Sequence, residues 1–150
     1  MHALGWLLVV LVGVVLPLQA LVNARLGALT AGPLFASLAS FVVGSVALLL
    51  AWVATRPQGL DTALLARVPW WAWSGGLMGA AFVVISTVMV PRLGAAALIC
   101  LVVFGQLAGS LLMDHFGVLN PRQPADPLRI LGVVLVAAGA LLVVKPWQRG

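Results

Sequence analysis

Two amides and a guanidinium follow the first apolar run of the chain. Gln19, Asn23 and Arg25 all lie in the stretch PLQALVNARLG. A spacing of four residues places the two amides on one face of a helix, and Pro17 just before them removes a backbone donor. Amides in hydrocarbon need hydrogen-bond partners, so such residues face a bundle interior or a wet cavity. We therefore predict that Gln19 and Asn23 bind a solute and that Arg25 reaches the membrane interface.

Other polar side chains interrupt later apolar runs. Ser37 and Ser40 lie close together in the second run, followed by Phe41, and Gln106 lies near the middle of the fourth. We expect the serines and Gln106 to complete a substrate-binding shell that Phe41 shields from lipid. The alternative is structural: hydroxyls in apolar helices often bond their own backbone, and an interhelical amide can simply join two helices.

Asp114 and His115 close the fourth apolar run. An Asp–His pair is compatible with proton coupling or gating, although two ligands without a third do not indicate a metal site. Capping the helix or holding the following loop is the alternative role. None of the three carboxylate side chains lies at the centre of an apolar run. The sequence therefore lacks the membrane-embedded carboxylate that commonly couples transport to protons.

The residue patterns of the common enzyme classes are not found in the sequence. There is no nucleophile with a nearby base, no glycine-rich phosphate loop and no clustered set of metal ligands. We therefore expect no enzyme activity, no catalytic residue, no metal and no cofactor.

The composition indicates a membrane protein. The chain has 150 residues, of which 63% are hydrophobic and 7% charged, and its mean hydropathy is +1.19. Soluble domains average about 25% charged residues. The net charge of +5 comes from basic residues placed singly between apolar runs, which is typical of anchors at lipid headgroups. We therefore expect the bilayer, and no nucleic acid, as a partner.

Five apolar runs predict an all-α membrane protein with five transmembrane helices, since about 20 helical residues cross a bilayer core. The whole chain, 1–150, is expected to form a single transmembrane domain. Pro91-Arg92 is expected to form a tight hairpin turn, and Asp61 to cap a short interfacial helix over Thr62–Val68. The predicted spans are approximately 4–24, 34–54, 71–90, 93–113 and 128–144.

The loop charges do not favour one orientation. Lys and Arg excess in short loops normally marks the cytoplasmic side, but five spans leave four basic residues on each side. One interpretation is that a partner or the first helix fixes the orientation. The other is that the chain inserts both ways and pairs with its inverted copy. The two sets are Arg56, Arg67, Arg122 and Arg129 against Arg25, Arg92, Lys145 and Arg149.

Small residues recur at four-residue steps in several spans, where they let helix backbones approach closely. We expect these positions to pack helices, either within one chain or between two copies. A bundle of five helices has little interior for a substrate, so dimerisation is expected. The positions are Gly32, Ala36, Ser40 and Gly44 in the second run, Gly75 and Gly79 in the third, and Gly105 and Gly109 in the fourth.

Taken together, these segments resemble the drug/metabolite transporter superfamily. More narrowly, they resemble its small bacterial inner-membrane branch, whose members are about as long as this chain and are related to the small multidrug resistance exporters. The resemblance runs from Gly5 to Val144, and GQLAGSLLMDHFG is its most specific part. It is carried by PLQALVNARLG, ASLASFVVGSVALL, PWWAWSGGLMGAAFVV, LVVFGQLAGSLLMDHFGVLN and RILGVVLVAAGALLVV.

This resemblance implies a multi-pass protein of the bacterial inner membrane that is half of a transporter bundle, completed by an antiparallel homodimer. One departure matters: the small multidrug exporters carry an acidic residue in the first helix, where this chain has only apolar residues before Gln19 and Asn23. Export of cationic drugs is therefore not implied. The amides favour a neutral or zwitterionic polar solute, or an anion held by amide N–H groups.

Three functions fit the sequence. The first is a dual-topology transporter, acting as an exporter, that moves a small polar metabolite by alternating access. The second is a passive small-ion channel formed by antiparallel dimers, which suits a pathway without a coupling carboxylate. The third is a non-transporting membrane scaffold or accessory subunit. Saturable flux separates the first from the second, and a stable complex with another protein indicates the third.

Overall fold

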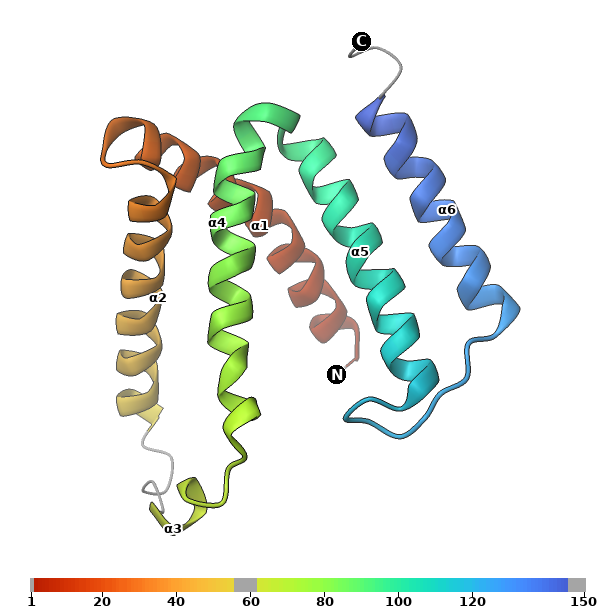
Figure 1. Cartoon of the computed structure of the whole chain (residues 1–150), viewed down its shortest axis with the longest axis horizontal. Coiled ribbons are helices and arrows are strands. Elements are labelled where there is room, and N and C mark those ends of the chain that lie inside the picture. The colour runs from red at the N-terminus through yellow and green to blue at the C-terminus, as the bar shows by residue number, and fades with distance from the viewer. Residues whose placement is uncertain (1, 56–61, 146–150) are drawn as a thin grey trace. The chain divides into compact units, whose positions relative to one another are not determined.

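The computed structural model describes residues 2–55 and 62–145, and every regular element in those ranges is a helix. The chain divides into two compact units, unit 1 (Met1–Pro91) and unit 2 (Arg92–Gly150). In chain order the elements are α1 (His2–Leu29), α2 (Pro33–Thr55), α3 (Thr62–Leu65), η1 (Trp70–Ser74), α4 (Gly75–Leu93), α5 (Ala95–Phe116) and α6 (Pro127–Val144) (Figure 1).

Within the described residues, five helical segments are long and apolar enough to cross a membrane: α1, α2, η1 with α4, α5 and α6. The predicted number of spans is confirmed. The first run was expected to end at residue 24, but α1 continues to Leu29. An α-helix keeps its backbone hydrogen bonds whatever the polarity of its side chains. Asn23 and Arg25 therefore lie inside α1 rather than beyond its end.

The turn between α4 and α5 lies later than Pro91-Arg92, where it was predicted. Helix α4 contains Pro91 and ends at Leu93, and α5 begins at Ala95 after Gly94, which has a φ of 81°. A proline in the last turn removes one helical hydrogen bond. A positive φ interrupts the helical backbone, and glycine adopts it at little cost. The break between α4 and α5 therefore falls at Gly94 rather than at Pro91.

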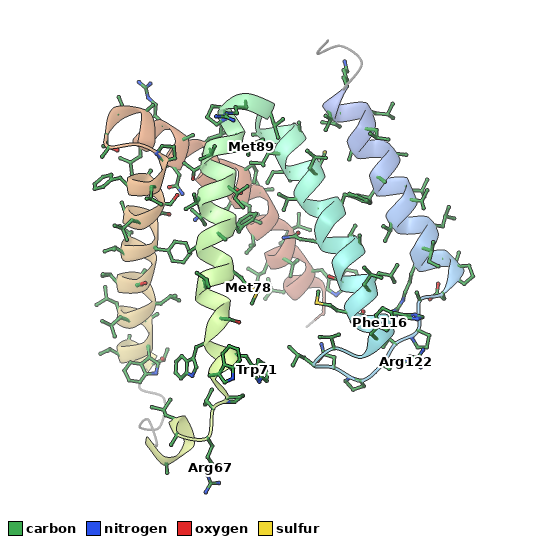
Figure 2. The ribbon with its side chains drawn as sticks, in the orientation of Figure 1. Arg67, Trp71, Met78, Met89, Phe116 and Arg122 are labelled. Atoms are coloured by element: carbon green, nitrogen blue, oxygen red, sulfur yellow. The ribbon has the colours of Figure 1, made fainter. Side chains whose placement is uncertain are left out.

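The segment before α4 is less helical than predicted. Helix α3 covers Thr62–Leu65 only, and the Val68 N–H bonds the Leu65 carbonyl in a turn, at 3.1 Å. The predicted cap, Asp61, lies outside the described residues. The tryptophans then form η1, where Trp71 is labelled in Figure 2, and Trp70 is 85% exposed. Exposed tryptophans at the start of a span fit the predicted headgroup level.

Helices α1 and α2 form an antiparallel hairpin in unit 1, with two contacts that fix their register. A Cβ atom on Gly27 would lie 3.2 Å from the carbonyl carbon and oxygen of Gly32, so the two backbones nearly touch there. About two turns before Gly27 on α1, the Gln19 Nε2 lies 3.5 Å from the Ser40 Oγ of α2. The two contacts are eight residues apart on each helix, so α1 and α2 run in opposite directions in a regular register.

Asn23 lies midway between these two contacts on α1, and Ala36 lies midway on α2. The register therefore makes them neighbours. Both are buried: Asn23 is 4% exposed and Ala36 0%. The small residues at the start of α2 thus pack against α1 within one chain, where the sequence left open whether they served a second copy. An alanine opposite Asn23 leaves the amide no polar partner from that position.

Unit 2 contains the α5–α6 hairpin and its connecting loop. Helix α5 is capped by Gly117, which follows its last residue, has a φ of 70° and donates its N–H to the Asp114 carbonyl at 3.2 Å, a common C-terminal cap. Asp126 precedes α6 as its N-cap, and its Oδ1 accepts the Arg129 N–H at 2.9 Å. An aspartate at this position satisfies a donor that the first helical turn leaves free. Both ends of the loop are therefore anchored by their own sequence.

Candidate functional site

Asn23 is the most unusual side chain of unit 1. It is almost fully buried, and its Nδ2 has no hydrogen-bond partner among residues 2–55 and 62–145. A buried donor without a partner costs about 1–3 kcal/mol, so proteins rarely keep one without a reason. The Asn23 amide is therefore available to donate to a bound molecule.

Two buried hydroxyls join α2 to α4 at the same end of unit 1. The Ser37 Oγ lies 3.5 Å from the Thr87 Oγ1. Each hydroxyl also donates to the carbonyl four residues earlier in its own helix: Ser37 to Pro33 at 2.8 Å and Thr87 to Val83 at 2.8 Å. The back-bonding expected as the structural alternative for Ser37 is present. The backbone carbonyls are the nearer acceptors of both protons, and Thr87 Oγ1 lies at the long limit for accepting from Ser37 as well.

The buried face of α4 contains hydroxyls that the sequence analysis did not select. Val83, Ser86, Thr87 and Val90 are all buried, and their spacing places them on one helix face. Thr87, 1% exposed, is the largest fully buried side chain among the described residues. The available signal was a Ser-Thr pair inside an apolar run, one turn before Pro91. Since proline has no N–H, the Thr87 carbonyl also lacks its usual donor four residues later.

Four of the predicted site residues lie near these groups in unit 1. Gln19 and Ser40 meet at 3.5 Å, which is the long limit of a hydrogen bond. The Phe41 ring packs against α4, where its Cζ lies 3.5 Å from the position of a Cβ on Gly79. A groove of about 390 Å³ lies beside Ser37 and Phe41, and its other lining residues are Leu34, Leu38, Ala80 and Val84.

The buried polar cluster, defined as Asn23, Ser37 and Thr87, lies towards one end of the spans. With a rise of 1.5 Å per residue, Asn23 and Ser37 lie about 10 Å from the midpoints of their spans. Thr87 lies about 8 Å from the midpoint of its own. All three are displaced towards the turns that end α1 and α4, as the order of the helices in Figure 1 shows. The cluster is therefore nearer one membrane surface than the other.

Gln106 belongs to unit 2, at the middle of α5, where it is exposed. Its predicted place in the substrate shell stays a prediction. The same holds for Gly44, Gly75, Gly105 and Gly109 as packing positions. In the part of the chain that the structure describes, a Cβ on any of these glycines would meet no atom within 4 Å. Of the six glycines predicted to pack helices, including Gly32, Gly79 is the one whose Cβ position has a neighbour within 4 Å among the described residues.

His115 holds the loop that follows α5. Its Nδ1 accepts the Ala125 N–H at 3.2 Å, and its carbonyl accepts the Arg122 Nε at 2.9 Å. The neighbouring Asp114 carbonyl accepts the Gln123 N–H at 2.8 Å. Figure 2 shows Arg122 on this loop, beyond Phe116 at the end of α5. These contacts support the loop-holding role, whereas coupling or gating by the pair stays a prediction.

The Asp114 side chain lines a groove of unit 2 between α5 and α6. The groove has a volume of about 390 Å³, and Ser110 and Arg129 are its other polar lining residues. Arg129 is already paired with Asp126, at 3.4 Å between Nε and Oδ2. The groove opens at the loop end of the hairpin and contains no buried polar group comparable with Asn23 among the residues described. Unit 1 therefore offers the stronger candidate site.

Comparison with known proteins places the chain in one family. Residues 4–142 match the protein family described as "Putative inner membrane exporter, YdcZ". The inner membrane protein YdcZ of Escherichia coli (strain K12) is 32% identical over 139 residues, which cover 89% of each chain. No solved structure matches the chain. The resemblance found in the sequence is confirmed: the chain belongs to the YdcZ family of inner membrane exporters, which are transporters rather than enzymes.

Proposed function

We propose that this protein exports a small polar metabolite across the bacterial inner membrane by alternating access, as an antiparallel homodimer. The observation that carries the proposal is the buried Asn23 amide, whose Nδ2 has no partner within the described ranges. A donor kept free at that cost is expected where a solute binds. Gln19 lies one turn before Asn23 on α1, where it meets Ser40 of α2, and Ser37 of α2 meets Thr87 of α4.

The burial of the amide supports alternating access over an open channel. Asn23 is 4% exposed, so a solute reaches it only when the helices around it move. An alternating-access transporter passes through such closed states, whereas a conducting pore keeps its polar lining wet. The α2–α4 contact suits such motion, because its polar part is one long hydroxyl contact, and Phe41 packs beside it against Gly79, which has no side chain to interlock.

Pairing with an inverted copy is supported by the balanced loop charges and by Gln106. An exposed amide at the middle of an apolar span is costly in lipid, and a second copy offers it a polar neighbour. The depth of the buried polar cluster adds a constraint. Two inverted copies of Asn23 would lie about 20 Å apart along the membrane normal, so we propose one site in each copy rather than one shared at the centre.

Metabolite profiling of cells tests the transport function. Cells that produce the wild-type protein, Asn23→Leu or Asn120→Leu are compared for compounds that accumulate in the medium. Asn120 is the matched control, since it is the other asparagine of the chain and lies in the loop after α5. We expect the same compounds to accumulate with wild type and Asn120→Leu and to be lost with Asn23→Leu. Identical profiles for all three proteins would contradict the proposal.

Flux through proteoliposomes then separates a transporter from a channel. The compound found by profiling is expected to saturate and to show counter-transport in vesicles with the purified protein. Unsaturable flux without counter-transport would indicate the channel instead. A protein that moves nothing but copurifies with another membrane protein would indicate the scaffold.

Labelling of one added cysteine tests the inverted pair. A cysteine is placed after Gly150 in a Cys100→Ala background, and intact cells are treated with an impermeant maleimide before and after permeabilisation. We expect about half of the protein to react before permeabilisation, since both orientations are present in equal amounts. All-or-none labelling would exclude the antiparallel homodimer and would leave the transport proposal to be judged by the flux.

A further inference from the structure

We propose that the buried polar cluster of unit 1 binds an uncharged group that both accepts and donates hydrogen bonds, such as a carboxamide or a hydroxyl, and that it rejects ions. This inference rests on the proposed function, in which the cluster is the transport site. The sequence left neutral, zwitterionic and anionic solutes open. The hydrogen bonds of the cluster narrow that choice.

The free donor of the cluster is the Asn23 Nδ2 group, which has no partner in the described part of the chain. The Ser37 and Thr87 hydroxyls donate to their own helices, since each hydroxyl oxygen lies 2.8 Å from the carbonyl oxygen four residues earlier, closer than the 3.5 Å between Ser37 Oγ and Thr87 Oγ1. A ligand therefore needs an acceptor for Asn23 and gains no donor from these two hydroxyls. An anion requires several donors around its oxygens. One free amide group is therefore a weak site for an anion.

The acceptors of the cluster are placed by the helix register: Ser37 follows Ala36, the residue opposite Asn23, and Thr87 lies 3.5 Å from Ser37. Ser37 Oγ and Thr87 Oγ1 keep lone pairs, and the Thr87 carbonyl has no N–H at Pro91 to accept. A ligand that satisfies these atoms must carry an N–H or O–H. An acceptor and a donor on neighbouring atoms are what a primary amide offers, and a hydroxyl offers both on one atom.

The surroundings carry no charge that would neutralise an ion. The buried polar residues described are Asn23, Ser37, Ser86 and Thr87, and none is ionisable at neutral pH. Arg25 follows Asn23 by two residues and is exposed, on another face of α1. An ion taken out of water without a counter-charge pays a desolvation cost that a few neutral dipoles do not repay. A neutral polar group pays far less.

The chain allows a direct test, because Asn23 and Asn120 are its two asparagines. Protein labelled with ¹⁵N in the asparagine side chains gives two NH₂ signals, and Asn23→Leu identifies the one from α1. Three probes of the same heavy-atom shape are then titrated at neutral pH: isobutyramide, isobutyrate and isobutyramidinium. They differ in charge, being neutral, negative and positive.

We expect isobutyramide to shift the Asn23 signal saturably, while the Asn120 signal, in the loop, stays in place and reports that the fold is intact. Neither ion should shift the Asn23 signal at the same concentration. An equal shift with either ion would overturn the inference. So would the absence of any shift up to the solubility limit, which would mean that the amide is occupied by water or serves packing alone.

The outcomes separate this inference from the proposed function. Saturable binding of isobutyramide without any Asn23-dependent export would keep the neutral-ligand site and remove the transport role. Export of an ion that depends on Asn23 would keep the transport role and remove the neutral-ligand inference. Thr87→Val gives a second check, since it keeps the side-chain shape and removes one acceptor. It should weaken isobutyramide binding several-fold without abolishing the Asn23 signal.

Discussion

The Ser37 Oγ lies 3.5 Å from the Thr87 Oγ1 and joins α2 to α4, yet each hydroxyl donates more closely to its own helix, at 2.8 Å. The interhelical contact is therefore a weak polar one between two groups already satisfied along their own backbones. Two helices held in this way can separate without leaving either hydroxyl proton unpaired. This suits a site that must open and close around a solute.

We expect a double-mutant cycle on this pair to give a small coupling energy. Ser37→Ala and Thr87→Val each remove one hydroxyl, and interhelical hydrogen bonds in membrane proteins average about 0.6 kcal/mol. The free energy of unfolding in mixed micelles is measured for the wild type, both single variants and the double variant. A coupling energy several times larger would show that the contact holds the unit together.

Asn23→Leu should separate stability from activity. Leucine has the branching of asparagine and removes a buried donor whose lack of a partner costs about 1–3 kcal/mol. We expect the free energy of unfolding to stay unchanged or to rise by about 1 kcal/mol, while export is lost. A clear loss of stability in the same unfolding assay would instead assign the amide to packing.

Gly27→Ala should destabilise the α1–α2 hairpin. The added Cβ would lie 3.2 Å from backbone atoms of Gly32 and Pro33, which cannot rotate away as a side chain can. Such overpacking costs about 1–3 kcal/mol. Gly13→Ala in the same helix is the matched control, because its Cβ meets no described atom within 4 Å. The melting temperatures of the two variants should differ, with the Gly27 variant lower.

His115→Leu should release the loop between α5 and α6. It removes the acceptor of the Ala125 N–H, and a lost hydrogen bond of about 1 kcal/mol corresponds to about a five-fold change in an opening equilibrium. Limited digestion with trypsin in micelles should therefore cut after Arg122 about five times faster. Cleavage after Arg67, in unit 1, should keep its wild-type rate. An unchanged rate at Arg122 would show that His115 does not hold the loop.

The sequence was sufficient for the number and type of the elements, because apolar length alone decides whether a helix can span a bilayer. The sequence was a less accurate guide to where each helix ends. The first span was ended at residue 24, where polar side chains begin, although the helix passes through them to Leu29. The turn between the third and fourth spans was predicted at Pro91, although the break between α4 and α5, with its positive φ, falls on Gly94. Polarity and proline content do not by themselves fix where a helix stops.

Only part of the candidate site was predicted from the sequence, because burial depends on which helix face meets a neighbour. Gln19 and Asn23 stood out because amides are rare in apolar helices, and the structure buries Asn23. Ser86 and Thr87 did not stand out, because a hydroxyl can satisfy itself along its own helix and gives no sign of which face is buried. That face is set by neighbouring helices, which four-residue spacing does not identify. Gln106 is exposed in the described chain, so its place in the site stays a prediction.

Because the buried polar cluster lies off the centre of its spans, the hydrocarbon layer between the cluster and the membrane surface would be thinner on one side than on the other. For upright spans centred in a hydrocarbon core about 30 Å across, Asn23 would lie about 5 Å from one surface and about 25 Å from the other. In the proposed transport site, a solute would exchange with the nearer compartment through movements of the last helical turns alone. Passage to the farther one must cross most of the insulating layer. In an inverted pair, the site of the second copy would lie near the opposite surface. Each compartment would then be separated from one of the two sites by only a thin layer.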